Sequence, residues 1–437
     1  MVSMTPYVNF SSASSKNIGN PRPIYKNLCF VSVLFAFVVG LLLGIFLPLV
    51  YFRSSSNSTS LLPPINETSE IRSVFMSNSF SAKNLSEINS YPTVSFVENF
   101  KAVEEEKDGK LIRNGIYWGD LVEKSLPEGY KEKKHALWRN YVDKAVAVKM
   151  ETGCGRMQNR LVVFQDGLKG CVRYRQNTDQ IQGELFSFYL AQILKLPNLA
   201  PSTVSIVDLK SPLWSNVRNE IASAQWNSNR AIVLTQFISD LGTANIPDVF
   251  RPTERHLNKF DVLNMTKNEV REAVDLTRTL VELAQWSDLI IFDYLTANLD
   301  RIVNNLYNYQ WNANIMDAPA HNLAKKSDGD LLVFLDNESG LLHGYRLLKK
   351  YEVYHSVLLE NLCVFRKQTA DVIRELRTRG DVGRLLRERF ETQNSAAIKD
   401  ILPSLPEKSV KVLNERIEKV YAQISKCESI YSDDGNA

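Results

Sequence analysis

The chain has 437 residues, of which 44% are hydrophobic, and its 52 basic and 49 acidic residues leave a net charge of +3. A chain of this length and composition can bury a large core over two or three structural units, so it is not disordered as a whole. The small net charge gives no support to nucleic-acid binding, because proteins with that function usually concentrate basic residues.

The first expected element is an uncharged apolar segment over residues 27–52. About 20 apolar residues span a bilayer, whereas the apolar part of a cleaved signal peptide is shorter, so the segment indicates an uncleaved signal anchor. Three basic residues precede it, and a single arginine closely follows it. This asymmetry predicts a cytosolic tail over 1–26 and a luminal remainder, which is a single-pass type II topology.

Residues 53–110 are rich in Ser, Asn and Glu, which predicts a flexible luminal stem ahead of a folded domain over 111–437. Asn337 fits the N-glycosylation pattern, but it lies between two acidic residues after an apolar strand, and we expect no glycan there. The pattern also gives four glycosylation candidates: Asn57, Asn66, Asn84 and Asn264.

Four cysteines lie beyond the apolar segment, and an even number in an oxidising compartment predicts two disulfides. The sequence allows three pairings and does not choose among them. We favour Cys154 with Cys171, which are near each other in a hairpin-like region, and Cys363 with Cys427 between C-terminal helices.

The first half of the luminal domain predicts a small sheet with one helix. Alternating residues over 144–151, 160–167 and 169–175 predict strands, and a Gly-containing turn follows the first of them. Apolar residues at helical spacing over 179–196 predict a helix, with Asp179 and Gln182 as its capping pair. Another strand is expected over 231–242.

The second half is mostly helical. Residues 266–285 predict a helix that opens with a capping box of Thr266 and Glu269, and residues 286–298 predict a second, buried helix. A short apolar strand within 330–341 and several amphipathic helices follow. A small β-rich lobe followed by a larger α-rich lobe is an α+β arrangement, and a cleft between lobes is a common ligand site.

Polar residues at the ends of these elements occur in the chain order of a protein kinase. A Gly turn comes first, then a strand arginine, Arg173, and a helix acid, Glu184. Asp300 and Asn305 follow at the Asp-to-Asn interval of a kinase catalytic loop, and Asp336 ends the later apolar strand. Each feature alone fits an ordinary turn or surface ion pair, but the five together predict a phosphotransferase site.

Whole phrases of the sequence resemble the four-jointed family of Golgi kinases, relatives of the secretory-pathway casein kinase. The resemblance covers most of residues 111–430. It is carried by "GCGRMQNRLVVFQDG", "CVRY", "QIQGELFSFYLAQIL", "QWSDLIIFDYLTANLDRIVNNL", "LVFLDNESGLLHGYR" and "CVFR". It implies a two-lobed, atypical kinase-like fold and a type II Golgi protein. It also implies ATP with Mn or Mg as cofactors, and Ser or Thr in extracellular cadherin repeats of Fat and Dachsous as substrates in planar cell polarity.

The resemblance also implies roles for single residues. Asp300 corresponds to the catalytic Asp, which orients the substrate hydroxyl and accepts its proton. Asn305 and Asp336 correspond to the metal-binding positions. Arg173 stands where kinases in general have lysine, and Glu184 orients it; the two would steady the nucleotide phosphates. The sequence leaves open whether the luminal domain is released from the stem by proteolysis.

Three alternatives remain open from the sequence. A Golgi glycosyltransferase shares the type II layout and would use a D-x-D motif, for which Asp328 and Asp330 are candidates. That pair precedes the apolar strand and forms an Asp-Gly turn, so we expect a loop there. A pseudokinase that binds cadherins, and a kinase that phosphorylates a glycan, are the other two.

Overall fold

A computed structural model describes Gly40 and residues 111–252, 256–267 and 273–432. The chain divides into two units, residues 1–92 and 93–437, and all described residues except Gly40 belong to the second. The expected anchor over 27–52, apart from Gly40, and the stem over 53–110 lie outside the described residues. Within the described residues, no helix is both long enough and apolar enough to cross a membrane.

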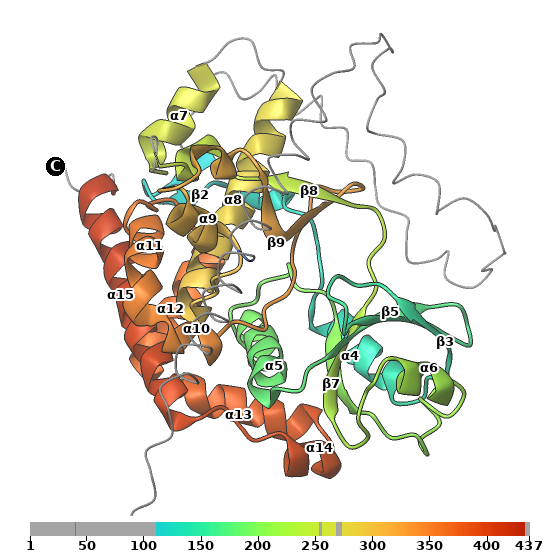
Figure 1. Cartoon of the computed structure of the whole chain (residues 1–437). Coiled ribbons are helices and arrows are strands. Elements are labelled where there is room, and N and C mark those ends of the chain that lie inside the picture. The colour runs from blue at the N-terminus through green and yellow to red at the C-terminus, as the bar shows by residue number, and fades with distance from the viewer. Residues whose placement is uncertain (1–39, 41–110, 253–255, 268–272, 433–437) are drawn as a thin grey trace, which may run out of the picture. The chain divides into compact units, whose positions relative to one another are not determined.

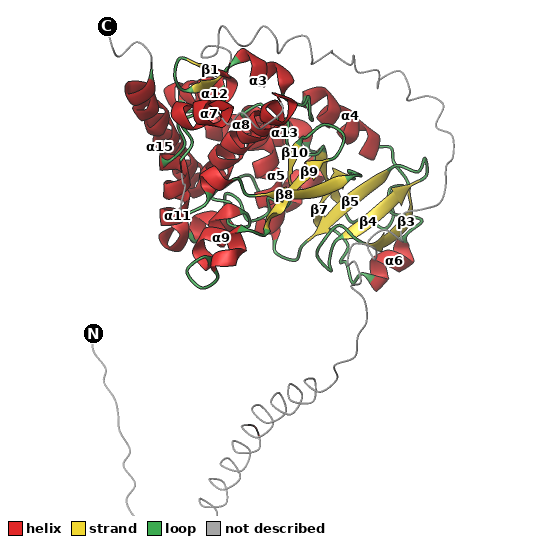
Figure 2. Ribbon diagram, turned by 90° about the horizontal axis from the view of Figure 1, so that it is seen from above, coloured by secondary structure: helices red, strands yellow, loops and turns green. Residues whose placement is uncertain are grey.

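A five-stranded antiparallel sheet forms the small lobe, in the order β3-β4-β5-β7-β6 (Figures 1 and 2). The strands expected at the start of the domain and over 231–242 are all present in it. Their bounds are Ala147–Thr152 for β3, Arg160–Phe164 for β4, Lys169–Tyr174 for β5, Ser202–Ile206 for β6 and Ala231–Gln236 for β7.

Helices cover both faces of this sheet. Alternate residues of β7 enter different cores: Val233 packs with α5 (Thr178–Ile193), and Ile232 packs with Trp138 of α4 (Glu132–Val142). This is the alternation that a strand buried on both faces requires. The short helix α6 (Arg218–Ser223) lies near β3.

The N-cap of helix α5 lies two residues before Asp179, which was expected to cap the helix together with Gln182. Asn177 is its N-cap, and its side chain accepts a hydrogen bond from the backbone N–H of Asp179 at 3.0 Å. Asn is among the best N-cap residues, and its oxygen satisfies an N–H that the helix itself leaves unpaired. The expectation for Asp179 was therefore wrong, whereas the helix itself was correctly predicted.

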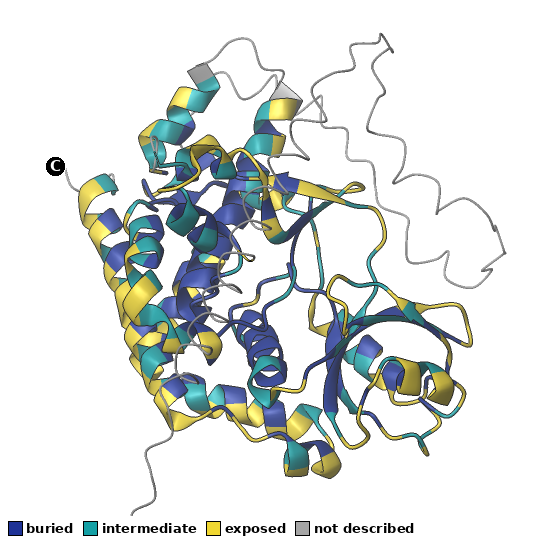
Figure 3. Ribbon diagram, in the orientation of Figure 1, coloured by how far each residue is buried: buried dark blue, intermediate teal, exposed yellow. Residues whose placement is uncertain are grey.

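The large lobe is built around α8 (Ala273–Thr296), a single helix where the sequence predicted two. Its apolar stripe widens until residues 280–297 are buried almost without interruption. In Figure 3 the start of this helix is yellow and teal, and its later turns are dark blue. Thr266 does not cap it. Thr266 lies within α7 (Lys259–Lys267), and its hydroxyl donates to the carbonyl of Leu263 at 2.6 Å. Glu269 lies outside the described residues.

The rest of the large lobe packs around α8 (Figure 1). This lobe contains a second antiparallel sheet, which has three strands in the order β10-β9-β8. Its strands are β8 Leu241–Asn245, β9 Pro319–Lys326 and β10 Leu332–Phe334. The hairpin of β1 Ile112–Arg113 and β2 Tyr117–Trp118 forms a separate two-stranded sheet. The helices are α3 Asp120–Ser125, α9 Ile302–Asn308, α10 His343–Arg346, α11 Leu348–Glu360, α12 Lys367–Arg379, α13 Val382–Gln393, α14 Ala396–Ile401 and α15 Glu407–Tyr431, with 3-10 turns at Asp248–Phe250 and Ala313–Met316.

Candidate active site

Arg173 connects the two lobes. Val172 and Tyr174 point into the small-lobe core, so strand alternation turns Arg173 to the opposite face of β5. Its Nη1 lies 2.7 Å from Asp336 Oδ1 and 2.6 Å from Glu338 Oε2, and its Nε lies 3.5 Å from Glu184 Oε2. The ion pair expected between a strand arginine and a helix acid is therefore present, and it includes the acid that follows the later strand.

Opposing effects act on the ionisation of this cluster. Burial lowers the pKa of Arg173, but the carboxylates of Glu184, Asp336 and Glu338 outweigh it and hold that pKa above its usual value. Burial also raises the pKa of Glu184, and the positive charge of Arg173 opposes that rise. Each charge in the cluster thus depends on an oppositely charged neighbour.

Glu338, Arg175 and Arg156 belong to the cluster but were not among the expected site residues. The Glu338 side chain is 1% exposed; it accepts a hydrogen bond from Arg175 Nε at 2.7 Å and forms an ion pair with Arg156 Nη1 at 2.8 Å. Strand alternation gives the direction of Glu338 only if the strand continues past Asp336. The strand β10 ends at Phe334, and Asp336 adopts a φ of 51°. Both acids nevertheless contact Arg173.

Asp300 lies close to Asp336. Burial raises the pKa of Asp300, and the negative charge of Asp336 is the second cause of the rise. The backbone N–H of Asp300 donates to Asn298 Oδ1 at 2.9 Å, which holds the start of the loop. The two expected acids are therefore brought together, although they come from different segments of the large lobe.

Asn305 has a different environment. It is 1% exposed on α9, and its Nδ2 donates to the carbonyl of Ile315 at 3.2 Å. Its Oδ1 is buried without a hydrogen-bond partner among the described residues. No hydrogen bond in that part of the chain joins Asn305 to Arg173, Asp300 or Asp336. Arg173, Glu184 and Asp336 are thus in direct contact, and Asp300 interacts electrostatically with Asp336, whereas Asn305 keeps one uncommitted oxygen.

Arg301, which the sequence analysis did not single out, fixes the loop around Asp300. It is fully buried, and its Nη1 pairs with Asp293 of α8. Its Nη2 donates to the carbonyl of Leu335 at 2.9 Å and to Asn337 Oδ1 at 2.6 Å. One guanidinium group therefore joins the loop of Asp300 to the segment that carries Asp336. The same contacts bury Asn337, which is 2% exposed.

A cavity of about 330 Å³ lies beside this cluster, and Arg173, Glu184 and Asp336 form its polar end. Its volume is within the range of small-molecule sites. Its apolar walls come from both lobes and include Val172, Phe188, Leu199, Ala200, Ile238 and Phe334. An apolar slot that ends in guanidinium and carboxylate groups suits a flat base attached to phosphates.

The donor set also bears on a divalent cation. Carboxylate and amide oxygens are the ligands that Mg²⁺ and Mn²⁺ prefer. Within the described residues, no three His, Cys, Asp or Glu side chains are arranged as a cation cage. Arginines lie between the carboxylates instead. The uncommitted Oδ1 of Asn305 and the carboxylate of Asp336 are nevertheless oxygen donors of the required kind.

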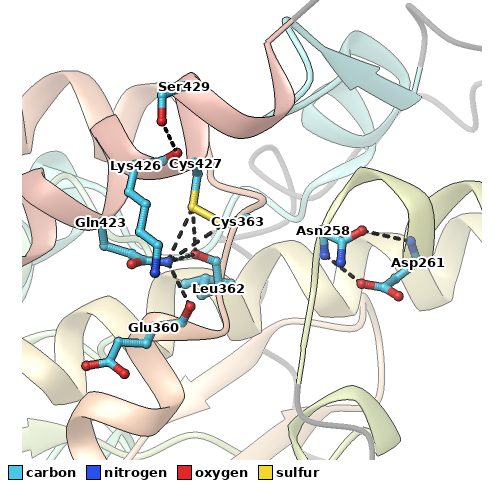
Figure 4. The surroundings of a disulfide bond; sticks show 9 residues. All are labelled: Asn258, Asp261, Glu360, Leu362, Cys363, Gln423, Lys426, Cys427 and Ser429. Carbon is cyan, nitrogen blue, oxygen red and sulfur yellow. Dashed lines mark hydrogen bonds between the residues drawn. A yellow bond between two sulfur atoms is a disulfide. The ribbon is translucent and has the colours of Figure 1, made fainter.

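Both favoured disulfide pairings are present. Cys154 and Cys171 are joined with Cα atoms 5.7 Å apart, and Cys363 and Cys427 with Cα atoms 5.3 Å apart (Figure 4). The first disulfide lines the cavity, and it links the Gly-containing turn to β5 next to Arg173. The second joins α15 to the segment before α12 in the large lobe.

The remaining candidates have simple environments. Asn264 is exposed on α7, while Asn57, Asn66 and Asn84 lie outside the described residues. Asp328 and Asp330 lie in the turn between β9 and β10, as expected of a loop. Asp328 pairs with Lys326, and Asp330 pairs with Arg278 and Lys325. These acids are committed to lysine and arginine side chains and lie outside the cavity.

The fold and site together define the class: a two-lobed α+β protein in which a strand base pairs with a helix acid, as in protein kinases. Residues 133–430 match the family model described as "Four-jointed box protein middle domain". The chain belongs to the four-jointed box family.

Two relatives illustrate the match. The chain is 52% identical over 363 residues to "Extracellular serine/threonine protein kinase four-jointed" of Drosophila melanogaster, covering 74% of this chain and 62% of that protein, which is less than two thirds of its length. It is 35% identical over 331 residues to "Four-jointed box protein 1" of Homo sapiens, covering 74% and 73%.

Solved structures show a more distant similarity. A crystal structure of the Golgi casein kinase aligns with a TM-score of 0.46 and 13% identity over 75% of this chain and 83% of that one. The Golgi casein kinase with Mn/ADP bound aligns with a TM-score of 0.45 and 11% identity over 81% and 94%.

Proposed function

We propose that this chain is a serine/threonine protein kinase that transfers the γ-phosphoryl group of ATP to a hydroxyl of a secretory-pathway protein. The observation that carries the proposal is the set of contacts of Arg173 with Glu184 and Asp336 at the polar end of an apolar cavity. The name of the Drosophila relative, an extracellular serine/threonine protein kinase, supports the same reaction.

Each residue of the site has a separate role in an in-line transfer. The base of the nucleotide occupies the apolar end of the cavity, and Arg173 binds the phosphates with the fork of donors that suits them. Glu184 holds Arg173 in place, because its Oε2 also accepts from the backbone N–H of Asn337 at 2.7 Å. The substrate hydroxyl attacks the γ-phosphorus, the bond to the β-phosphate oxygen breaks, and Asp300 accepts the hydroxyl proton.

A divalent ion, Mn²⁺ or Mg²⁺, would be held by Asp336 and by Asn305, whose uncommitted oxygen supports this assignment. When bound, the ion neutralises charge on the phosphates. Arg156, which pairs with Asp336 and Glu338, would then turn toward phosphate oxygens. Arg156 can do so readily, because its side chain is 53% exposed in the Gly-containing turn.

The compartment and substrates are also part of the proposal. The apolar segment and the basic residues before it support a type II Golgi protein with the domain 111–437 in the lumen. A form of that domain released from the stem is a further part of the proposal. The resemblance to the four-jointed family supports extracellular cadherin repeats of the Fat and Dachsous type as acceptors, with a role in planar cell polarity and growth signalling.

The test is phosphate transfer from radiolabelled ATP to purified cadherin-repeat fragments by the full-length chain, followed by mass spectrometry of the modified residue. Asp300→Ala is expected to abolish transfer while keeping the thermal unfolding midpoint. Asp400→Ala, at an exposed acid of α14, serves as the matched control and should transfer normally. Transfer by a folded Asp300→Ala protein would refute the mechanism, and no transfer by the unaltered chain to any fragment would refute the substrate.

A further inference from the structure

Four aromatic rings meet on the large lobe next to the proposed catalytic loop. Helix α9 follows the loop of Asp300 directly, and it packs beside α11 (Figures 1 and 2). Tyr307 of α9 lies at the centre of the group, and its ring centroid is 5.1 Å from those of Trp311 and Tyr351. The ring centroid of Tyr354 lies 5.8 Å from it. We call these four residues the aromatic surface.

The aromatic surface is open to solvent. Trp311 is 67% exposed, and the three tyrosines are half-buried. A single exposed aromatic residue is ordinary, whereas a contiguous exposed group of them is typical of an interaction site. Trp and Tyr are also enriched among the residues that contribute most to binding between proteins.

Two lysines add positive charge to the aromatic surface. Lys350 Nζ lies 4.1 Å from the ring centroid of Tyr307 and 4.8 Å from that of Tyr351. Lys349 is its exposed neighbour on α11. Neither lysine forms an ion pair with an acid within the ranges that the structure describes.

The acids closest to these lysines along the chain have other partners. Asp317, in the segment after α9, pairs with Arg251, and Glu352 of α11 pairs with Arg416 and Lys419. Helix α9 contains neither Asp nor Glu. The other acid of α11 is its last residue, about 15 Å along the helix from the lysines. The aromatic surface therefore carries a positive charge that no carboxylate compensates in the described part of the chain.

A carboxylate on a peptide is the ligand that this arrangement favours. Ammonium groups and phenol hydroxyls are both donors, and a carboxylate accepts from either. The rings add rigid apolar area, which favours a peptide segment over a free anion. Sulfated glycans are instead bound by runs of about five or more basic residues, and two lysines fall short of that.

The position of Asp300 determines where the carboxylate would lie in such a segment. Tyr307 follows Asp300 by seven positions, and a helix rises about 1.5 Å per residue, so the aromatic surface begins about 10 Å from the catalytic loop. An extended peptide covers about 3.3 Å per residue. A carboxylate bound on the aromatic surface would therefore lie about three to six residues from a hydroxyl bound at Asp300.

We propose that the aromatic surface, with Lys349 and Lys350, binds an acidic segment of the acceptor protein. The acidic residues lie about three to six positions from the Ser or Thr that accepts the phosphoryl group. This inference rests on the proposed function and deepens it, because it adds a requirement for acidic residues near the acceptor hydroxyl. Binding of the segment needs no phosphoryl transfer, so it can be measured apart from catalysis.

The test measures binding of fluorescein-labelled peptides to the full-length chain by fluorescence anisotropy, at low and at physiological ionic strength. Each peptide has alanine in place of the acceptor serine and a run of glutamates on one side of it. Comparison peptides carry glutamine in place of glutamate, and a heparin tetrasaccharide is the sulfated probe. The variants are Trp311→Ala and the double change Lys349→Gln with Lys350→Gln. The matched control is Lys408→Gln with Lys411→Gln, at two exposed lysines of α15.

At least one glutamate peptide is expected to bind the unaltered chain and the α15 control equally. The double change at Lys349 and Lys350 should weaken that binding by about tenfold at low salt, and by less as salt rises. Trp311→Ala should weaken it by about fivefold or more. All three altered proteins should keep the thermal unfolding midpoint of the unaltered chain, because the changed side chains are exposed.

The other outcomes overturn the proposal. They are absence of peptide binding, equal binding of glutamate and glutamine peptides, binding that the double change at Lys349 and Lys350 leaves intact, and tighter binding of the heparin tetrasaccharide. A chain that binds a glutamate peptide but does not phosphorylate its serine form would instead count against the proposed function alone.

Discussion

Arg173 of β5 and Asp336 after β10 lie 163 positions apart in the chain, and their side chains are joined at 2.7 Å. The contact links the small-lobe sheet to the segment that leaves the large-lobe sheet. Because Glu184 and Glu338 bind the same guanidinium group, this single side chain holds three acids from two lobes. The geometry of the proposed phosphate site therefore depends on one arginine.

Replacing Arg173 by methionine is expected to lower stability and abolish activity. The side chains of Arg173 and Asp336 are both only 14% exposed, and removing one partner of a buried pair costs about 3–5 kcal/mol. Arg173→Lys should restore most of the stability, because it restores the charge. It should still lower kcat/KM by about 10²-fold, because a single ammonium replaces a fork of donors.

Urea unfolding and steady-state kinetics would measure these two effects. Arg218→Lys serves as the matched control, because Arg218 is exposed on α6 of the same lobe and has no ion pair within the described ranges. If Arg173→Lys kept full activity, the fork of donors would have no role in binding phosphate.

Replacing Asp300 by asparagine should remove a pH-dependent step. The pKa of Asp300 is raised above 3.8 by burial and by the charge of Asp336, and the form that accepts a proton is the deprotonated one. As the pH falls through this raised pKa, Asp300 becomes protonated and kcat should fall with it. Asp300→Asn is expected to lose about 10²–10⁴-fold in kcat and to lose this acid limb.

The measurement is kcat against pH for both proteins, with thermal stabilisation by ATP as a check on nucleotide binding. Stabilisation by ATP should be similar in both. An unchanged acid limb in Asp300→Asn would assign the titration to another group.

Arg301 and Asp293 should show strong energetic coupling. Arg301 is fully buried and supplies donors to Asp293, Leu335 and Asn337. Arg301→Met or Asp293→Asn alone is expected to cost about 3–5 kcal/mol, because each leaves the other charge buried. The double variant should be less destabilised than the sum, with a coupling of about 0.5–3 kcal/mol.

Urea unfolding of the four proteins in this cycle gives the coupling directly. The exposed pair of Arg384 and Glu388 on α13 is a suitable comparison, because such surface pairs contribute below about 1 kcal/mol. Additive effects at Arg301 and Asp293 would show that the buried pair does not act as a unit.

The parts of this site that sequence could predict are those set by local periodicity. Alternation located β4 and β5, and so placed Arg173 on a strand face. Helical spacing located α5, and so placed Glu184 on a helix beside the sheet. The catalytic-loop spacing then singled out Asp300. Each of these inferences uses residues within one element, where the period of the backbone determines direction.

The parts that sequence missed depend on contacts between distant segments. In the sequence, nothing distinguishes Arg301 from other polar residues. Its role follows only from the fold, which places its donors against Leu335 and Asn337. Glu338 lies four positions after the last strand residue. The left-handed backbone at Asp336 sets the direction of the Glu338 side chain, so the alternation of a strand does not apply there. The sequence predicted two helices in place of α8, because its first part is amphipathic whereas its second part is buried on all sides.

The two disulfides should differ in their effect on nucleotide binding. Cys154 and Cys171 enclose a loop with a sequence separation of 17, and Cys363 and Cys427 one of 64. Loop-closure entropy predicts that removing them costs about 3 and about 4 kcal/mol of stability, respectively. Only the first disulfide lines the proposed nucleotide cavity, where it also fixes the turn that carries Arg156. Replacing Cys154 and Cys171 by alanine should therefore weaken ATP binding, whereas replacing Cys363 and Cys427 should lower stability alone. Titration of ATP against each folded double variant measures this difference, and equal ATP affinities would show that the turn needs no covalent link to β5.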